Sequence, residues 1–115
     1  MPKTRRELVD RALDVLGVLA SGQVPEVEDV ARLDGYVETT IEDLLERDII
    51  DIPDPEEIEL SIFDDLAKVL ANNAREGFGL ANDPRLAATA QAAEKRLLEK
   101  SWIAPTYKPL KTQYF

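Results

Sequence analysis

Residues 58–70 read IELSIFDDLAKVL, with apolar side chains at the spacing of one helical face. The members of this face are Ile58, Ile62, Phe63, Leu66, Val69 and Leu70. The helix begins either at Asp54-Pro55, which resembles a cap followed by a first-turn proline, or at Ser61. Gly77-Phe78-Gly79 ends it. Such a face needs partner helices to bury it, and three further segments supply them.

The first partner begins at Thr4, because Thr4-Arg5-Arg6-Glu7 has the capping-box pattern. Its apolar positions are Leu8, Ala12, Val15, Leu16 and Leu19. Gly22 is the expected end, since glycine accepts the left-handed conformation that terminates many helices.

The second partner is predicted as one helix from Pro25 to Arg47. Its apolar stripe consists of Val27, Val30, Leu33 (or Asp34 at that turn), Val37, Ile41, Leu44 and Leu45. Gly35 falls inside it and permits either close packing or a kink. The cluster Ile49, Ile50 and Ile52 then forms a buried connector with a short bridge of extended pairing.

The third partner begins at Asn82-Asp83-Pro84 and runs to about Lys100. Leu86, Ala90, Ala93, Leu97 and Leu98 are available for packing. The sequence therefore predicts an all-α protein: a small four-helix bundle over residues 1–100, followed by an extended C-terminal arm over residues 101–115. Prolines 105 and 109 oppose a helix in that arm.

Charge is distributed unevenly along the chain, whose net charge is −9. Residues 26–65 hold two basic and sixteen acidic side chains, whereas residues 101–115 hold two lysines and no acid. A segment this acidic repels phosphate. It is either a solvated surface that maintains solubility or a surface that faces DNA without holding it.

The composition argues against catalysis. The chain has no histidine and no cysteine, and its five glycines form no phosphate-binding loop. The carboxylates at 51, 54, 56, 57 and 59 lack EF-hand spacing and are interpreted as helix-start and solvating groups. We expect no enzyme activity, no cofactor and no metal site. We also expect no signal peptide and no membrane span, because no segment approaches roughly 18 apolar residues.

The C-terminal arm holds four of the seven aromatic residues. Trp102 and Ile103 adjoin the last helix and are expected to join the core of their own chain. The remainder is expected to bind a partner, because aromatic residues and leucine in an extended segment are good anchors. The predicted partner-binding residues are Tyr107, Pro109, Leu110, Tyr114 and Phe115.

Taken in order, four stretches resemble the small head-to-tail adaptor (connector) proteins of tailed bacteriophages and gene transfer agents. They are Thr4 to Leu13 followed by Leu16-Gly17 and Ser21-Gly22-Gln23; Val37 to Arg47 leading to Asp48-Ile49-Ile50-Asp51-Ile52-Pro53; Phe63 to Asn73 leading to Gly77-Phe78-Gly79; and Pro105-Thr106-Tyr107 to Gln113-Tyr114-Phe115. None is a catalytic signature.

This resemblance implies a helix bundle that joins the portal protein and the tail proteins as a homo-oligomeric ring, of about twelve subunits. It implies an arm that reaches the portal or a neighbouring subunit, and a lumen through which DNA passes without specific binding. The expected location is the head–tail junction of the virion, after synthesis in the host cytoplasm. The alternative is a small acidic helical regulator, or an antitoxin-like protein-binding module, whose acidic surface mimics nucleic acid.

Overall fold

The computed structural model describes residues 2–17, 24–80 and 83–103, with side chains described up to residue 100. The helices are α1 (Arg5–Leu16), α2 (Val27–Asp34), α3 (Val37–Glu46), α4 (Leu60–Ala74) and α5 (Pro84–Ile103), with a 3-10 turn, η1 (Arg75–Phe78). No strand occurs in this described part, where the only extended pairing is one isolated bridge between Lys3 and Ile58. The predicted all-α class is confirmed.

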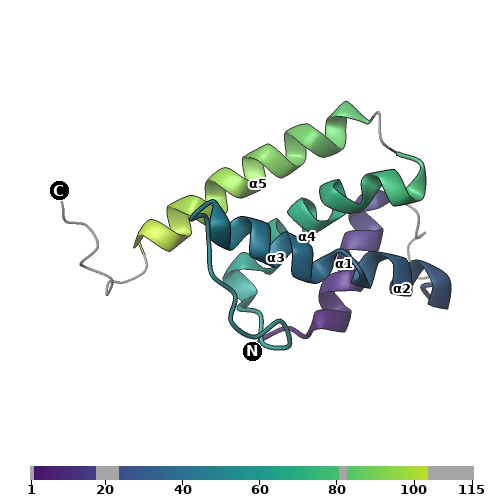
Figure 1. Ribbon diagram of the computed structural model, residues 1–115, viewed down its shortest axis with the longest axis horizontal. Coiled ribbons are helices and arrows are strands. Elements are labelled where there is room, and N and C mark those ends of the chain that lie inside the picture. Colours follow the sequence, from purple (N-terminus) through teal and green to yellow (C-terminus); the bar gives the residue numbers. More distant parts are fainter. Residues whose placement is uncertain (1, 18–23, 81–82, 104–115) are drawn as a thin grey trace.

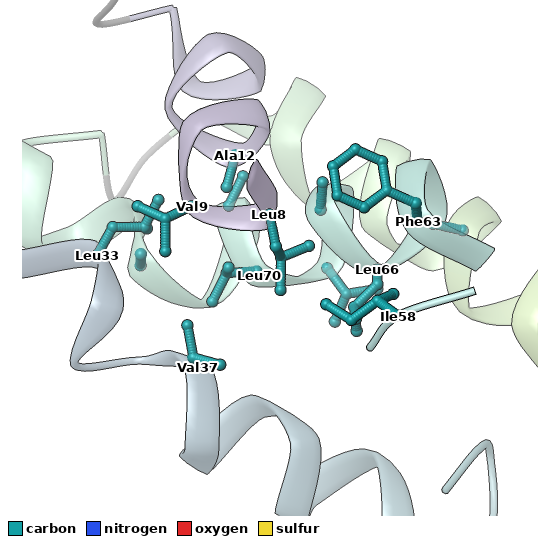
Figure 2. Packing of buried hydrophobic residues seen from close by; sticks show 14 of the residues in the cluster. Leu8, Val9, Ala12, Leu33, Val37, Ile58, Phe63, Leu66 and Leu70 are labelled. Carbon is teal, nitrogen blue, oxygen red and sulfur yellow. The ribbon is translucent and has the colours of Figure 1, made fainter. Parts of the chain in front are cut away.

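Helix α4 is the centre of the fold. It packs along α5 on one side and against α1 on the other, with α3 also in contact (Figure 1). Leu66 and Leu70 of α4 are fully buried, and every position of the predicted 58–70 face is buried as well. In Figure 2 they meet side chains from three other helices: Leu8, Val9 and Ala12 of α1, Leu33 of α2 and Val37 of α3.

Helix α1 begins as predicted and ends early. Both hydrogen bonds of the capping box form between Thr4 and Glu7. Gly17, at φ 81°, ends the helix and donates its backbone N–H to the carbonyl of Asp14. The predicted end at Gly22 is therefore wrong: the glycine five residues earlier already adopts the left-handed conformation that terminates the helix. Residues 18–23, including Leu19, lie outside the described residues.

The predicted single helix from Pro25 to Arg47 is wrong, because it is broken at Gly35-Tyr36 into α2 and α3. Of the two roles expected for Gly35, the kink is therefore realised as a full break. The Tyr36 N–H turns back to the carbonyl of Leu33, at 2.9 Å. The Asp34 carbonyl instead accepts a hydrogen bond from Arg5 of α1, at 3.3 Å. A side chain 29 positions away thus satisfies a carbonyl that a continuous helix would have bonded internally.

The connector between α3 and α4 is anchored at Ile49, Ile52 and Ile58, which are buried, while Ile50 is half-buried. This confirms most of the predicted buried connector. The extended pairing lies at its far end, where Ile58 and Lys3 exchange two backbone hydrogen bonds of 2.7 and 2.8 Å. No helix starts at Asp54-Pro55: the Asp54 carboxylate instead accepts from the Glu56 N–H in a turn, and α4 begins at Leu60.

Helix α5 begins at Pro84, as predicted, and continues to Ile103. The first three residues of the predicted extended arm are therefore helical, and the boundary at residue 101 is wrong over that stretch. Leu86, Ala90, Ala93 and Leu97 are buried as predicted, whereas Leu98 is 39% exposed. Because α4 and α5 run side by side, the C-terminal half of α5 is held against the start of α4 (Figure 1).

Candidate interaction surface

Arg5 links α1 to the junction of α2 and α3. Its Nε lies 2.7 Å from Asp34 Oδ1, and its Nη1 lies 3.2 Å from Glu38 Oε2. The hydrogen bond to Asp34, supported by that to Glu38, raises the pKa of the Arg5 guanidinium above its usual value despite partial burial. A planar guanidinium is suited to holding two acceptors in fixed positions. Arg5 therefore sets how α2 and α3 meet at the break.

Two other arginines bridge helices in the same way: Arg11 with Asp14 and Asp64, and Arg47 with Asp43 and Glu94. Arg11 joins α1 to α4, and Arg47 joins the end of α3 to α5. The pKa of each guanidinium is raised, chiefly by the hydrogen bond to Asp64 in the case of Arg11 and by the hydrogen bond to Glu94 in the case of Arg47. Arg5, Arg11 and Arg47 are therefore already engaged with specific carboxylates.

Most acids between residues 26 and 65 remain without a cation in the described part of the chain. Five of the sixteen form ion pairs: Asp34, Glu38, Asp43, Asp64 and Asp65. The other eleven do not: Glu26, Glu28, Asp29, Glu42, Glu46, Asp48, Asp51, Asp54, Glu56, Glu57 and Glu59. This uncompensated charge makes the segment a candidate interaction surface.

The densest part of this surface is residues 48–59, here named the acidic loop. It carries six exposed acids and no basic residue. Its start is fixed by a Schellman motif at the end of α3, in which the N–H groups of Asp48 and Ile49 bond the carbonyls of Leu45 and Leu44. Its end is fixed by the Ile58–Lys3 bridge. The carboxylates are therefore presented on a backbone that is held at both ends.

A second part of the surface lies on α3 and is named the α3 strip: Glu42, Leu45 and Glu46. Leu45 and Glu46 follow Glu42 by three and four residues, so both lie on the same side of the helix as Glu42. All three are exposed, and Leu45 is exposed to 48% although it belongs to the predicted buried stripe. The strip therefore offers an apolar side chain flanked by two carboxylates.

The C-terminal half of α5 is fixed by a buried carboxylate on α4. Asp65, with a side chain only 6% exposed, accepts from Arg96 Nε at 2.9 Å and from Lys100 Nζ at 3.3 Å. Lys100 also donates to the carbonyl of Ser61. Sequence reasoning missed this arrangement, although Arg96 and Lys100 are four residues apart and so lie on one side of a helix. The last turns of α5 are thereby held in place.

The five predicted partner-binding residues, Tyr107, Pro109, Leu110, Tyr114 and Phe115, lie outside the described residues, as do the side chains of Trp102 and Ile103. What the structure does provide is their starting point, at the anchored end of α5. In Figure 1 this end extends past α3 and α4.

Among the described residues, no helix is long and apolar enough to cross a membrane, and no group of three or more acids is arranged to hold a metal ion. Comparison with protein-family models, with curated proteins and with solved structures gave no match.

Proposed function

We propose that this chain is a structural subunit of a head-to-tail adaptor ring in a tailed bacteriophage. In this proposal copies of the chain form a ring on the portal protein, join it to the tail proteins and surround a lumen through which DNA passes. The protein acts at the head–tail junction of the virion and is not an enzyme. The observation that carries the proposal is the acidic loop, a fixed surface of six uncompensated carboxylates.

The physical argument concerns DNA that must move without being held. Duplex DNA carries about one negative charge per 1.7 Å of its axis, and proteins bind it by neutralising phosphates with lysine and arginine. The acidic loop has no such residue, and two arginines close to it are already paired: Arg5 with Asp34 and Glu38, and Arg47 with Asp43 and Glu94. Carboxylates that lie within a Debye length of about 8–10 Å of DNA repel its phosphates, and they do so equally for every base sequence. This suits a channel that lets DNA slide.

The second support is the anchored end of α5. Asp65, Arg96 and Lys100 hold the helix at the point from which the predicted partner-binding residues continue. A segment that starts from a fixed base reaches a limited set of positions, which lowers the entropic cost of docking on the portal or on a neighbouring subunit.

The deciding experiment is peptide mass spectrometry on gradient-purified virions from the source culture, quantified against the major capsid protein. The proposal expects roughly a dozen copies per particle, as a closed ring on the portal requires. Finding none in the particles would refute it. The chain would then be pursued as a small acidic regulator or antitoxin-like module, by isolating its soluble partner from the cell.

A second experiment tests the role of the acidic loop. In the variant Asp51→Asn, Asp54→Asn and Glu57→Gln, three charges are removed without changing side-chain size. We expect assembled particles whose DNA release is slowed, because the wall repels phosphate less. The matched control, Glu26→Gln, Glu28→Gln and Asp29→Asn, removes the same charge at the start of α2. Unchanged release in the loop variant, or equal slowing in both, would contradict a DNA-facing loop.

A further inference from the structure

The α3 strip differs in kind from the acidic loop. Leu45 is 48% exposed between Glu42 and Glu46, whereas the acidic loop contains no exposed large apolar side chain. An exposed leucine adds nothing to a surface that only repels DNA. An apolar contact point flanked by carboxylates instead matches a partner with an apolar side chain flanked by cations. The strip therefore has the chemistry of a docking site.

This chain contains a segment with the matching chemistry. Residues 104–115 hold two lysines and no acid, and in Lys108-Pro109-Leu110-Lys111 a leucine stands between the two lysines. Leu45 stands between two glutamates on the α3 strip in the same manner. Tyr107, Tyr114 and Phe115 add further apolar surface. Twelve extended residues span up to about 40 Å, which is enough to leave the subunit that they start from.

The position of α5 allows residues 104–115 to reach a neighbouring copy, because the end of the helix extends beyond α3 and α4 (Figure 1). Asp65, with Arg96 and Lys100, holds the C-terminal half of α5, and the helix then extends past α3 and α4 before residue 104 (Figure 1). We propose that the α3 strip of one copy binds residues 104–115 of the next copy. This inference rests on the proposed ring, and it leaves the acidic loop uncovered for DNA.

The first test measures binding of a fluorescent synthetic peptide of residues 104–115 to the full-length protein by anisotropy. We expect saturable binding that weakens about tenfold or more in the protein variant Glu42→Lys/Glu46→Lys, because like charges then face each other. Leu45→Asp should weaken binding as strongly. A peptide carrying Lys108→Glu and Lys111→Glu should bind the charge-reversed protein and not the original one.

The matched control is Glu26→Lys/Glu28→Lys, which reverses two unpaired acids on and beside α2. It should leave peptide binding within about twofold, and the thermal midpoint of every variant is measured so that unfolding is not mistaken for lost binding. Equal weakening by the control, or no rescue by the charge-reversed peptide, would overturn the α3 strip as the site. Absence of saturable binding at millimolar peptide would overturn it as well.

A second test separates docking between copies from docking within one copy. A photo-crosslinking benzoylphenylalanine replaces Leu45 in a nitrogen-15-labelled copy, which is mixed with unlabelled full-length protein. We expect crosslinks from the labelled position 45 to unlabelled residues 104–115. Crosslinks confined to one isotope would show that the segment folds onto its own subunit, against the inference. Crosslinking between copies by a protein that is missing from virions would refute the adaptor ring and leave the α3 strip as a self-association site.

Discussion

Replacing Asp65 by asparagine tests the contact that positions the end of α5. The carboxylate is 6% exposed and accepts charge-assisted hydrogen bonds from Arg96 and Lys100. Each such bond contributes about 1.5–3 kcal/mol. The lower end applies here, because the two cations are 44% and 41% exposed and water replaces part of what they lose. Asparagine keeps the shape, retains one acceptor and turns an N–H group toward the other cation. We therefore expect a loss of about 2 kcal/mol in the free energy of unfolding.

The measurement is urea unfolding at pH 7 followed by the helical circular dichroism signal. With a slope of about 1–2 kcal/mol per molar urea, the Asp65→Asn midpoint should fall by about 1–2 M. Asp64→Asn is the matched control: its neighbouring carboxylate is 60% exposed and pairs with Arg11, so it should change stability by about 0.5 kcal/mol or less. Combining Asp65→Asn with Arg96→Gln should give less than the sum of the two, by about 1 kcal/mol, because both remove the same contact. If Asp65→Asn lowers the free energy of unfolding no more than Asp64→Asn does, the buried carboxylate contributes no net stability. The reasoning about its contact with Arg96 and Lys100 is then refuted.

Five further predictions concern the helix ends and the charged segments. Asp48→Gly should raise stability by about 1 kcal/mol in urea unfolding, because Asp48 holds φ 59° at the carbonyl end of α3, where glycine has no steric cost and a negative charge is unfavourable. Thr4→Ala should lower stability by about 1 kcal/mol through loss of the cap. The hydrogen bond from the backbone N–H of Thr4 lowers the pKa of Glu7. The Glu7 carboxylate therefore contributes fully to the free energy of unfolding above its ordinary pKa of 4.5, and this contribution is lost as pH falls through the lowered pKa. Glu7→Gln should remove that part of the pH dependence of stability in an acid titration. Deleting residues 108–115 should preserve the helical circular dichroism signal and abolish ring formation on the portal. The isolated full-length protein should not retard duplex DNA in a low-salt gel shift.

Local patterns predicted what depends on nearby residues. The capping box at Thr4, the buried face of α4 and the start of α5 at Pro84 each rest on a few consecutive residues. The end of α1 could not be predicted from nearby residues. Gly17 and Gly22 are both suitable helix terminators, and nothing in the local sequence favours Gly17. A pattern that offers two valid endings leaves the choice to tertiary packing.

The break between α2 and α3 shows why longer-range features were missed. Gly35 weakens a helix by only about 1 kcal/mol, which does not by itself divide it. The break is supported by Arg5, which bonds both the carbonyl and the carboxylate of Asp34 from the start of α1. The acidic surface could be predicted only in part for the same reason. The sequence shows its charge, but which carboxylates are paired depends on arginines from other helices. Leu45 was assigned to the apolar stripe by its helical spacing, yet α3 buries Val37, Thr40 and Leu44 and leaves Leu45 48% exposed.

The order of the acidic loop supports the proposal that it does more than keep the protein soluble. Solubility requires only net charge and places no demand on backbone order. Yet the loop is fixed by the Schellman motif at Asp48, by the buried Ile49 and Ile52, and by the bridge from Ile58 to Lys3. Each of these contacts opposes the conformational entropy of a segment whose carboxylates repel one another. A fold that orders six like charges in this way presents them in a defined direction. Such order favours the proposed channel wall over a purely solubilising segment.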